Sequence, residues 1–267
     1  MEICLNPYIK NLNRLEFMLT LACTGRCKHC SEGDHTDSEE PIDGDAAAEM
    51  VRRVAENYKI ESLMTFGGEP LLYPDAVYKI HEAARDMGIP KRQLITNGFF
   101  SRDEGKIREV TGQLIDSGVN AILLSADAFH QETIPLEPVR TFAMEVMAKR
   151  KGRISLGTSV IIKTNPAWLV SAEAENPYNV RTKEILKEFQ TLGIEAASGN
   201  VIFPSGNALK YLGEYFDLSV PQVSPYDEDP MDIRAICVSP NGDVLGGNIY
   251  RTDIMEIIKA YHPGHSQ

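Results

Sequence analysis

Short apolar segments and longer amphipathic segments alternate along most of this chain. Segments with the composition of buried strands lie at 15–21, 61–66, 93–96, 121–125, 154–163 and 195–203. Segments with one apolar helical face lie at 45–58, 75–87, 103–117, 137–150 and 180–192. Strands that alternate with helices form parallel βαβ units with right-handed crossovers. The alternation therefore predicts an α/β fold, and its extent favours a partial (β/α)6 TIM-type barrel over the complete eightfold barrel.

The pattern changes after Pro204, where prolines interrupt the periodicity. The segment 233–238, the turn Pro240–Asp243 and the residues 244–245 predict a β-hairpin, and 253–261 predicts a short closing helix. We therefore expect an N-terminal extension, a partial barrel and a C-terminal extension that covers the barrel. These parts span 1–13, 14–206 and 207–267.

Composition excludes several classes of protein. The 267 residues are 43% apolar and 24% charged, which is typical of a soluble globular chain with a sizeable core. A net charge of −11 argues against nucleic acid as a partner, because no phosphate-neutralising surface is implied. The chain shows no basic and apolar leader and no long apolar run. We expect a cytoplasmic protein without a membrane partner.

Three cysteines lie close together directly after the first predicted strand. Cys23, Cys27 and Cys30 have the spacing Cys-x3-Cys-x2-Cys. Clustered thiolates are soft ligands that suit an iron–sulfur cluster, and three of them leave one iron of a cubane cluster open. Zinc is the alternative, in a Cys3His site completed by His29 or His35. A cluster-stabilised or zinc-stabilised binding protein therefore remains the non-enzyme alternative.

A second motif ends the next predicted strand, at Gly67-Gly68-Glu69-Pro70. Two glycines at the end of a strand let a ligand approach the backbone closely. The carboxylate of Glu69 could hold an ammonium group. Both motifs lie at the carboxyl ends of predicted strands, where ligands bind in parallel α/β folds.

With both motifs in this order and spacing, the chain resembles the radical S-adenosylmethionine (SAM) superfamily over roughly residues 14–206. The resemblance implies that Cys23, Cys27 and Cys30 bind one 4Fe–4S cluster and that the methionine end of SAM chelates the open iron. It implies reductive cleavage of SAM to a 5′-deoxyadenosyl radical, which abstracts a hydrogen atom from a substrate. It further implies a low-potential electron donor, ferredoxin or flavodoxin, and an anaerobic host.

The resemblance also assigns SAM contacts to the turns after the strands. Gly67, Gly68, Glu69 and Pro70 form the turn that contacts the methionine amino group in the family. The turn with Thr96 and Asn97 resembles one that faces SAM.

Other assignments compete with structural roles. Ser125 and Asp127 resemble a Ser-x-Asp motif that touches the ribose or carboxylate, and the alternative is a turn that caps the next helix. His29 takes the place of an aromatic residue near the adenine, and its ring can still stack there. His130 is more readily a pocket-wall residue than an acid or base. The turn at 203–208 either borders the adenine or reverses the chain.

The tail from Cys237 onward resembles a degenerate SPASM or twitch extension of peptide-modifying members. That extension binds further clusters through many more cysteines, so we expect no auxiliary cluster here. Cys237 itself is a candidate catalytic residue that gives a hydrogen atom to a substrate radical. The alternative is a hairpin that only covers the barrel edge.

The tail favours a peptide or natural-product precursor as the substrate. A small metabolite or cofactor intermediate and a glycyl-radical enzyme that the chain activates are the alternatives. The overall reaction class, whether oxidoreductase, transferase or lyase, stays open at this point.

Overall fold

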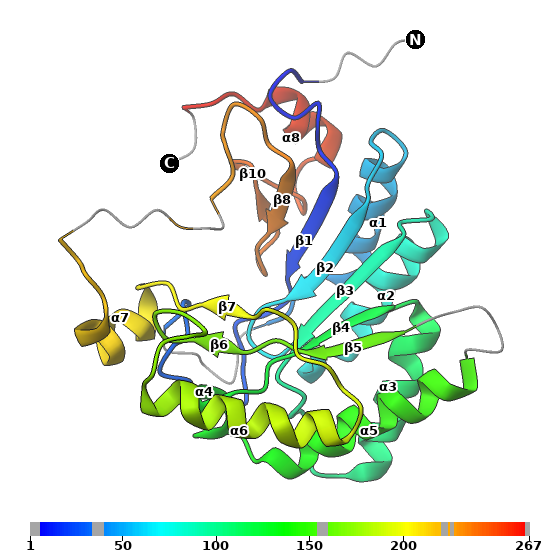
Figure 1. Ribbon diagram of the computed structural model, residues 1–267. Coiled ribbons are helices and arrows are strands. Elements are labelled where there is room, and N and C mark those ends of the chain that lie inside the picture. Colours follow the sequence, from blue (N-terminus) through cyan, green and yellow to red (C-terminus); the bar gives the residue numbers. More distant parts are fainter. Residues whose placement is uncertain (1–5, 34–39, 154–159, 220–223, 225–226, 265–267) are drawn as a thin grey trace.

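The computed structural model describes residues 6–33, 40–153, 160–219, 224 and 227–264. Its main feature is a six-stranded parallel sheet in the order β5-β4-β3-β2-β1-β8 (Figure 1). The strands are β1 (Arg14–Met18), β2 (Ser62–Phe66), β3 (Lys91–Thr96), β4 (Ala121–Leu124), β5 (Ile161–Thr164) and β8 (Ala235–Val238). The sheet does not close, because β5 and β8 are its two edges. This is the partial barrel that the alternation predicts.

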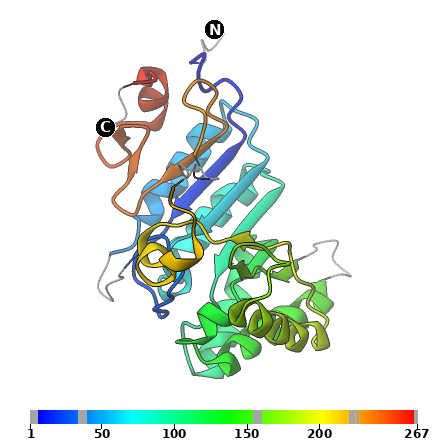
Figure 2. The ribbon, with the colours of Figure 1, turned by 60° about the vertical axis from the view of Figure 1, so that its left-hand side comes forward.

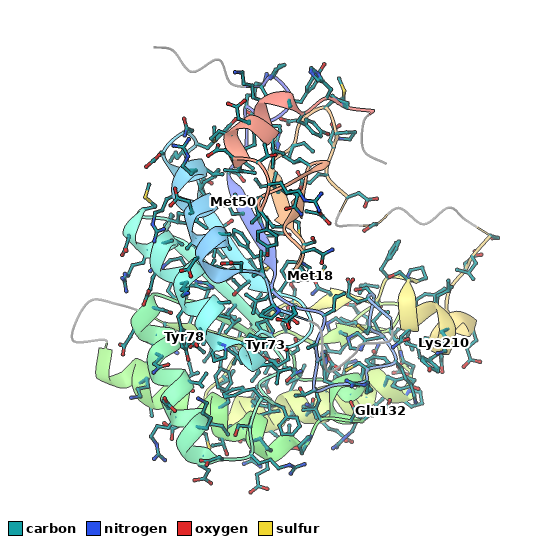
Figure 3. All side chains as sticks on the ribbon, turned by 180° about the vertical axis from the view of Figure 1, so that it is seen from behind. Met18, Met50, Tyr73, Tyr78, Glu132 and Lys210 are labelled. Atoms are coloured by element: carbon teal, nitrogen blue, oxygen red, sulfur yellow. The ribbon has the colours of Figure 1, made fainter. Side chains whose placement is uncertain are left out.

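Helices cover one face of this sheet. They are α1 (Gly44–Ala55), α2 (Pro74–Asp86), α3 (Glu104–Ser117), α5 (Leu136–Arg153) and, beyond α1, α8 (Ile254–Ala260). The helix α1 packs against α2, α2 against α3 and α3 against α5, so the layer follows the strand order. Figure 3 shows this layer from behind, with Met50 on α1 and Tyr78 on α2 in front of the sheet.

Local sequence explains why these helices form where they do. Asp43 caps α1, since its side chain accepts hydrogen bonds from the backbone N–H groups of the first turn. Met50, Val51 and Val54 form an apolar stripe that is fully buried against the sheet layer. Gly118 ends α3 in a left-handed conformation (φ 109°), as a glycine after a helix does.

The two faces of the sheet differ in burial. In β1, Leu15 and Phe17 are fully buried, whereas Glu16 and Met18 are half-buried. Because side chains alternate along a strand, Glu16 and Met18 point away from the buried, helix-covered face. The opposite face is therefore the interior of the open barrel.

The remaining elements surround the carboxyl end of the sheet. They are α4 (Ala128–Gln131), β6 (Ala167–Trp168), α6 (Pro177–Thr191), β7 (Asn200–Val201), α7 (Gly206–Leu212) and the 3₁₀ turns η1 (Pro70–Leu72) and η3 (Gly213–Tyr215). Figure 2 shows α7 (yellow) beside the loop that carries the clustered cysteines (dark blue). Among the described residues, no helix is both long and apolar enough to cross a membrane.

The strand predicted at 195–203 takes a different place. Ala196 makes a single parallel bridge to Thr164, and β7 pairs with β6 in a separate two-stranded sheet. Gly199 causes the break: its φ of +75° bends the chain, and a Cβ there would lie 2.3 Å from the Pro166 carbonyl oxygen. The sixth strand of the main sheet is β8 instead. Residues 154–159 of the strand predicted at 154–163 lie outside the described part.

The C-terminal extension also differs in detail. The segment predicted as the first hairpin strand supplies β8, which runs parallel to β1. The hairpin itself consists of β9 (Asp243–Val244) and β10 (Gly247–Asn248). Ile236 and Val238 of β8 are buried in the main core, so hydrophobic burial holds this segment in the sheet.

Candidate active site

A cavity of about 260 Å³ lies at the carboxyl ends of the strands. Its wall includes residues of the cysteine loop, of the turns after β2, β3 and β4, and of the segment around β6 and β7. Of the predicted site residues, the wall contains Cys23, Cys27, His29, Cys30, Gly67, Gly68, Thr96, Asn97 and Ser125. The motifs that are far apart in the sequence therefore meet at one place.

The other predicted residues are not among the described residues that line this cavity. They are Glu69, Pro70, Asp127 and Cys237. Glu69 and Asp127 are fully buried beside the cavity and bind other parts of the protein, as described below.

The glycine turn is fixed to the chain that enters the cysteine loop. The backbone N–H of Gly68 donates to the Thr20 carbonyl (2.7 Å), and that of Glu69 donates to the Ala22 carbonyl (2.8 Å). A Cβ on Gly68 would lie 2.1 Å from the Ala22 carbonyl oxygen, and Gly67 has a φ of +132°. Glycine is required at both positions for close backbone contact with the cysteine loop.

Glu69 joins the turns after β2 and β3. Its Oε1 accepts hydrogen bonds from the Leu71 N–H (2.9 Å) and the Thr96 hydroxyl (2.7 Å). Its Oε2 accepts from the Asn97 N–H (2.8 Å). Burial raises the pKa of Glu69 to about 7, although these hydrogen bonds act in the opposite direction.

This carboxyl group predicts a pH dependence of stability for the cluster-free chain. A folded-state pKa above the unfolded value means that the folded state holds the proton more tightly. The contribution of Glu69 to the free energy of unfolding is therefore expected to be largest below pH 4.5. It should fall by on the order of 3 kcal/mol as the pH rises to about 7. Urea unfolding of wild-type protein and Glu69→Gln across this range measures it. If the free energy of unfolding changes equally with pH in the two proteins, Glu69 is not the group responsible.

Hydrogen-bond donors lie beside the Cys23 thiol. The Gly25 N–H donates to Cys23 Sγ (3.3 Å), and Asn97 Nδ2 lies 3.7 Å from the same sulfur. Burial raises the pKa of Cys23 to about 11 and also raises those of Cys27 and Cys30. The thiols are thus protonated at neutral pH until a metal centre displaces their protons. Three soft ligands with N–H donors nearby fit a three-cysteine iron–sulfur cluster.

Asn207, at the start of α7, holds the other end of the cysteine loop. Its backbone N–H donates to the Cys30 carbonyl (2.9 Å), and its buried side-chain amide donates to the carbonyls of Gly33 (3.1 Å) and Cys27 (3.4 Å). The sequence pointed to a turn here but not to this contact. The structure shows a turn at 203–208 that is bonded to the cysteine loop, and Phe203 at its start lines the cavity, so the adenine contact stays a prediction.

Asn207→Ala is expected to destabilise the protein by about 1–3 kcal/mol, because it removes the buried amide that donates to the carbonyls of Gly33 and Cys27. We further expect the cluster of the variant to be lost faster in the presence of a chelator. Urea unfolding and the decay of cluster absorbance measure these effects. Asn241→Ala, in an exposed turn, serves as the matched control. Unchanged decay in Asn207→Ala would show that the loop does not depend on this contact.

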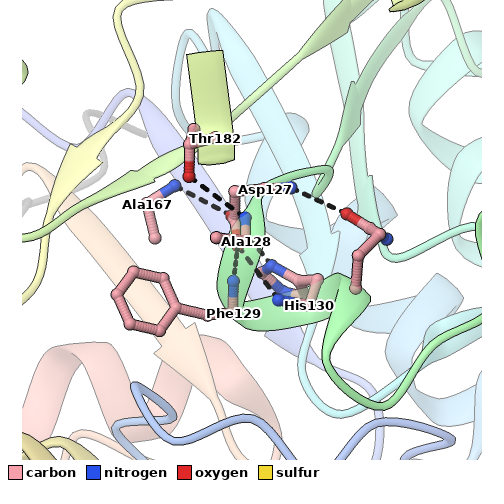
Figure 4. Close-up of polar contacts among 7 residues, drawn as sticks. Asp127, Ala128, Phe129, His130, Ala167 and Thr182 are labelled. Carbon is pink, nitrogen blue, oxygen red and sulfur yellow. Dashed lines mark hydrogen bonds and ion pairs between the residues drawn. The ribbon is translucent and has the colours of Figure 1, made fainter. Parts of the chain in front are cut away.

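Asp127 caps α4 and holds His130 (Figure 4). Its Oδ1 accepts from the N–H groups of Phe129 (2.9 Å) and His130 (3.0 Å). Its Oδ2 lies 2.9 Å from both His130 Nδ1 and the Ala167 N–H. Burial alone would raise the pKa of Asp127, but His130 and these donors lower it well below its usual range. The capping alternative is therefore present in the structure, and through it Asp127 positions His130 in the cavity wall.

His29 packs on protein rings. Its ring centroid lies 4.7 Å from that of His130 and 5.1 Å from that of Phe129. Burial lowers the pKa of His29 to about 4, so the ring is neutral at pH 7. Its Nδ1 atom is buried and has no hydrogen-bond partner among the described residues. The adenine contact of His29 stays a prediction.

Cys237 lies in β8, in register with Glu16 of β1. It alternates with the buried Ile236 and Val238, so it shares the barrel-side face with Glu16 and is exposed. Its role as a hydrogen-atom donor stays a prediction.

Sequence reasoning missed part of the cavity wall. The prediction lacks the residues that follow β5 and those of β7 and just after it, namely Asn165, Pro166, Ala167, Asn200, Val201 and Ile202. Phe203, which also lines the cavity, belongs to the turn at 203–208 for which an adenine contact was one of two predicted roles. The position of Asn165 directly after a parallel strand was an available signal. No local signal in the sequence indicated the bend at Gly199 that brings residues 200–203 to the cavity.

Comparison with known proteins decides the family. The Radical SAM superfamily model matches residues 17–155, which include the cysteine loop and the glycine turn. The chain belongs to the radical SAM superfamily. The chain is therefore an enzyme of SAM-dependent radical chemistry, and members of this family use a three-cysteine 4Fe–4S cluster together with SAM.

Curated relatives of this radical SAM enzyme match only in part. A probable GTP 3′,8-cyclase of Metallosphaera sedula is 30% identical over 129 residues, which are 48% of this chain and 38% of the relative. A GTP 3′,8-cyclase of Clostridium perfringens is 23% identical over 68% of this chain and 58% of the relative. The chain thus spans less than two thirds of the length of either relative.

Solved structures share the fold. SuiB of Streptococcus suis bound to the precursor peptide SuiA has a TM-score of 0.56 at 13% identity, over 98% of this chain and 66% of SuiB. Native anSMEcpe with bound AdoMet and the Kp18Cys peptide also has a TM-score of 0.56, at 15% identity, over 95% of this chain and 82% of that one.

Proposed function

We propose that this radical SAM enzyme abstracts a hydrogen atom from a peptide or natural-product precursor. The observation that carries the proposal is the meeting of three cysteine thiols with the glycine turn at one cavity, beside a barrel that stays open between β5 and β8. Because β5 and β8 do not pair with each other, the proposal places an extended substrate chain between these two edges.

The proposed roles follow from the positions of the residues. Cys23, Cys27 and Cys30 hold the cluster, and the backbone of Gly67 and Gly68 borders the methionine end of SAM. Thr96 and Asn97, aligned by Glu69, and Ser125 complete the wall on that side. When bound, the cluster and SAM together supply a 5′-deoxyadenosyl radical. The protein orients SAM and the substrate and keeps water from the reacting atoms.

Asp127 takes a positioning role in this proposal. Its carboxylate accepts hydrogen bonds from α4 and from Ala167 and holds the His130 ring, so it shapes the cavity wall from behind. Pro70 likewise acts indirectly, since it begins η1 directly after Glu69.

The structural relatives support a peptide substrate through their fold, since the aligned SuiB and anSMEcpe structures contain peptides. A small metabolite is the second candidate, because the sequence relatives are named GTP 3′,8-cyclases. Activation of a glycyl-radical enzyme is a third possibility that no relative named above supports. The free thiols of the described residues and an oxygen-sensitive site favour a cytoplasmic, reducing environment.

The test has two stages. The protein, reconstituted anaerobically with iron and sulfide, is given SAM and dithionite, or a ferredoxin or flavodoxin as the electron donor. Formation of 5′-deoxyadenosine is expected, and its absence from protein with a complete cluster would overturn the proposal. Deuterated peptides and deuterated GTP are then compared as sources of deuterium in 5′-deoxyadenosine. Transfer from GTP alone would select the metabolite alternative.

We also propose that Cys237, on the barrel-side face of β8, gives the hydrogen atom of its thiol to a substrate radical, and that one electron from the external low-potential donor and one proton from solvent restore the thiol from the resulting thiyl radical. Cys237→Ala should then form 5′-deoxyadenosine normally and yield an altered or racemised product. The same product at the same rate as wild type would overturn this role.

A further inference from the structure

Two histidines of the cavity wall, His29 and His130, have no assigned ligand role in the proposed function and lie next to Cys27, one of the cluster cysteines. Cys27 Sγ and one ring nitrogen each of His29 and His130 lie within 4.8 Å of one another. This spacing suits one small ion. A cubane cluster differs, because it distributes its thiolates over separate iron atoms.

The contacts of His130 prepare it to bind a metal. Asp127 Oδ2 accepts from Nδ1 of His130, which fixes the ring and leaves Nε2 as the ligand atom (Figure 4). A carboxylate behind a histidine is the usual support of a zinc-binding imidazole. Asp127 is itself held by the backbone N–H groups of Phe129 and Ala167, so the support is rigid.

His29 adds an independent indication. Within the part of the chain that the structure describes, its Nδ1 is buried without a hydrogen-bond partner, and such polar atoms are uncommon because they lose their solvation without compensation. The contact of its ring with that of His130 brings the two imidazoles together. A metal ion between them would satisfy the orphaned side chain.

We propose that the cluster-free chain binds one zinc-type divalent ion through Cys27, His29 and His130, with a fourth position left to water. In a tetrahedral zinc site these three ligand atoms are separated by roughly 3.5 Å, so the side chains must approach one another by about 1 Å. Binding exchanges the Cys27 thiol proton for the metal bond, and the proton goes to solvent. The ion and the iron–sulfur cluster exclude each other, since both need Cys27.

The test uses the full cluster-free chain and anaerobic titration with Co²⁺, whose thiolate charge-transfer and d–d bands report ligand type and geometry. We expect one tetrahedral ion per chain with a single thiolate ligand. The double variant Cys23→Ser/Cys30→Ser should retain the bands, and Cys27→Ser should lose the charge-transfer band. His29→Ala and His130→Ala should weaken binding by at least tenfold. His262→Ala, at an exposed histidine far from the cysteine loop, and Cys237→Ser are the matched controls.

Loss of the bands in the double cysteine variant, with wild-type affinity in both histidine variants, would overturn the proposal in favour of a cysteine-only site. A measurement on the wild-type chain avoids variants that fail to fold. X-ray absorption of the zinc-loaded chain should show one sulfur and two imidazole ligands, and three sulfur ligands would overturn the proposal. Neither experiment depends on SAM cleavage, so the outcome is independent of the proposed function.

Discussion

Replacing any one of Cys23, Cys27 or Cys30 with serine is expected to reduce SAM cleavage below detection. The three thiols are supplied by one loop at the cavity, and no other cysteine of the described residues lines that cavity. A serine hydroxyl is a harder and more weakly binding ligand for iron than a thiolate. Two remaining thiolates leave two irons of a cubane without protein ligands, so the cluster should be lost.

The readouts are iron and sulfide content, visible absorbance and 5′-deoxyadenosine formed with dithionite. Cys237→Ser is the matched control for cluster content, since Cys237 lies in β8 and outside the cavity wall. The cysteine variants are expected to fold, because the core of the protein lies on the other face of the sheet. Circular dichroism checks this. A serine variant that retains a full cluster and SAM cleavage would show that its cysteine is not a ligand.

The fold was predictable where local signals agree with tertiary packing. The helix at 45–58 was predicted from an apolar stripe that includes Val51 and Val54, and the structure buries both. The strands at 15–21 and 61–66 were predicted from short apolar runs, and both form within a few residues of the predicted bounds. Hydrophobic period, caps and glycines after helices are local features, so a sequence displays them directly.

The partners of the C-terminal strand were not predictable. The segment 235–238 pairs with β1, more than two hundred residues earlier in the chain. Its apolar residues alternate as in a hairpin strand, and nothing local distinguishes a hairpin partner from a distant parallel one. The choice depends on which edge of the sheet is free, which is a property of the whole fold.

The candidate site was likewise predictable only in part. The cysteine loop and the glycine turn were predicted as motifs, and both line the cavity. The hydrogen bonds of Glu69 to the turn after β3, and those of Asn207 to the cysteine loop, join residues distant in the sequence. Spacing along the chain carries no signal for such contacts, because they arise only when the strands are placed side by side.

Gly68→Ala is expected to have the second-largest effect on activity. The added Cβ would lie 2.1 Å from the carbonyl oxygen and 2.7 Å from the carbonyl carbon of Ala22. Both are backbone atoms, which cannot move aside as the end of a flexible side chain can. The turn must therefore separate from the chain that enters the cysteine loop, which weakens the bonds from Gly68 to Thr20 and from Glu69 to Ala22.

Overpacking of this kind typically costs 1–3 kcal/mol, and here the strain acts directly on the geometry of the cavity. A displacement of about 1 Å between reacting groups lowers rates on the order of 100-fold, so a comparable loss of 5′-deoxyadenosine formation is expected. Urea unfolding and the rate of SAM cleavage, normalised to cluster content, separate the two effects. Gly213→Ala is the matched control, because Gly213 has a φ of −54° and open space around its Cβ position. If Gly68→Ala cleaves SAM as fast as Gly213→Ala, the close contact between turn and loop does not hold the cavity in its active geometry.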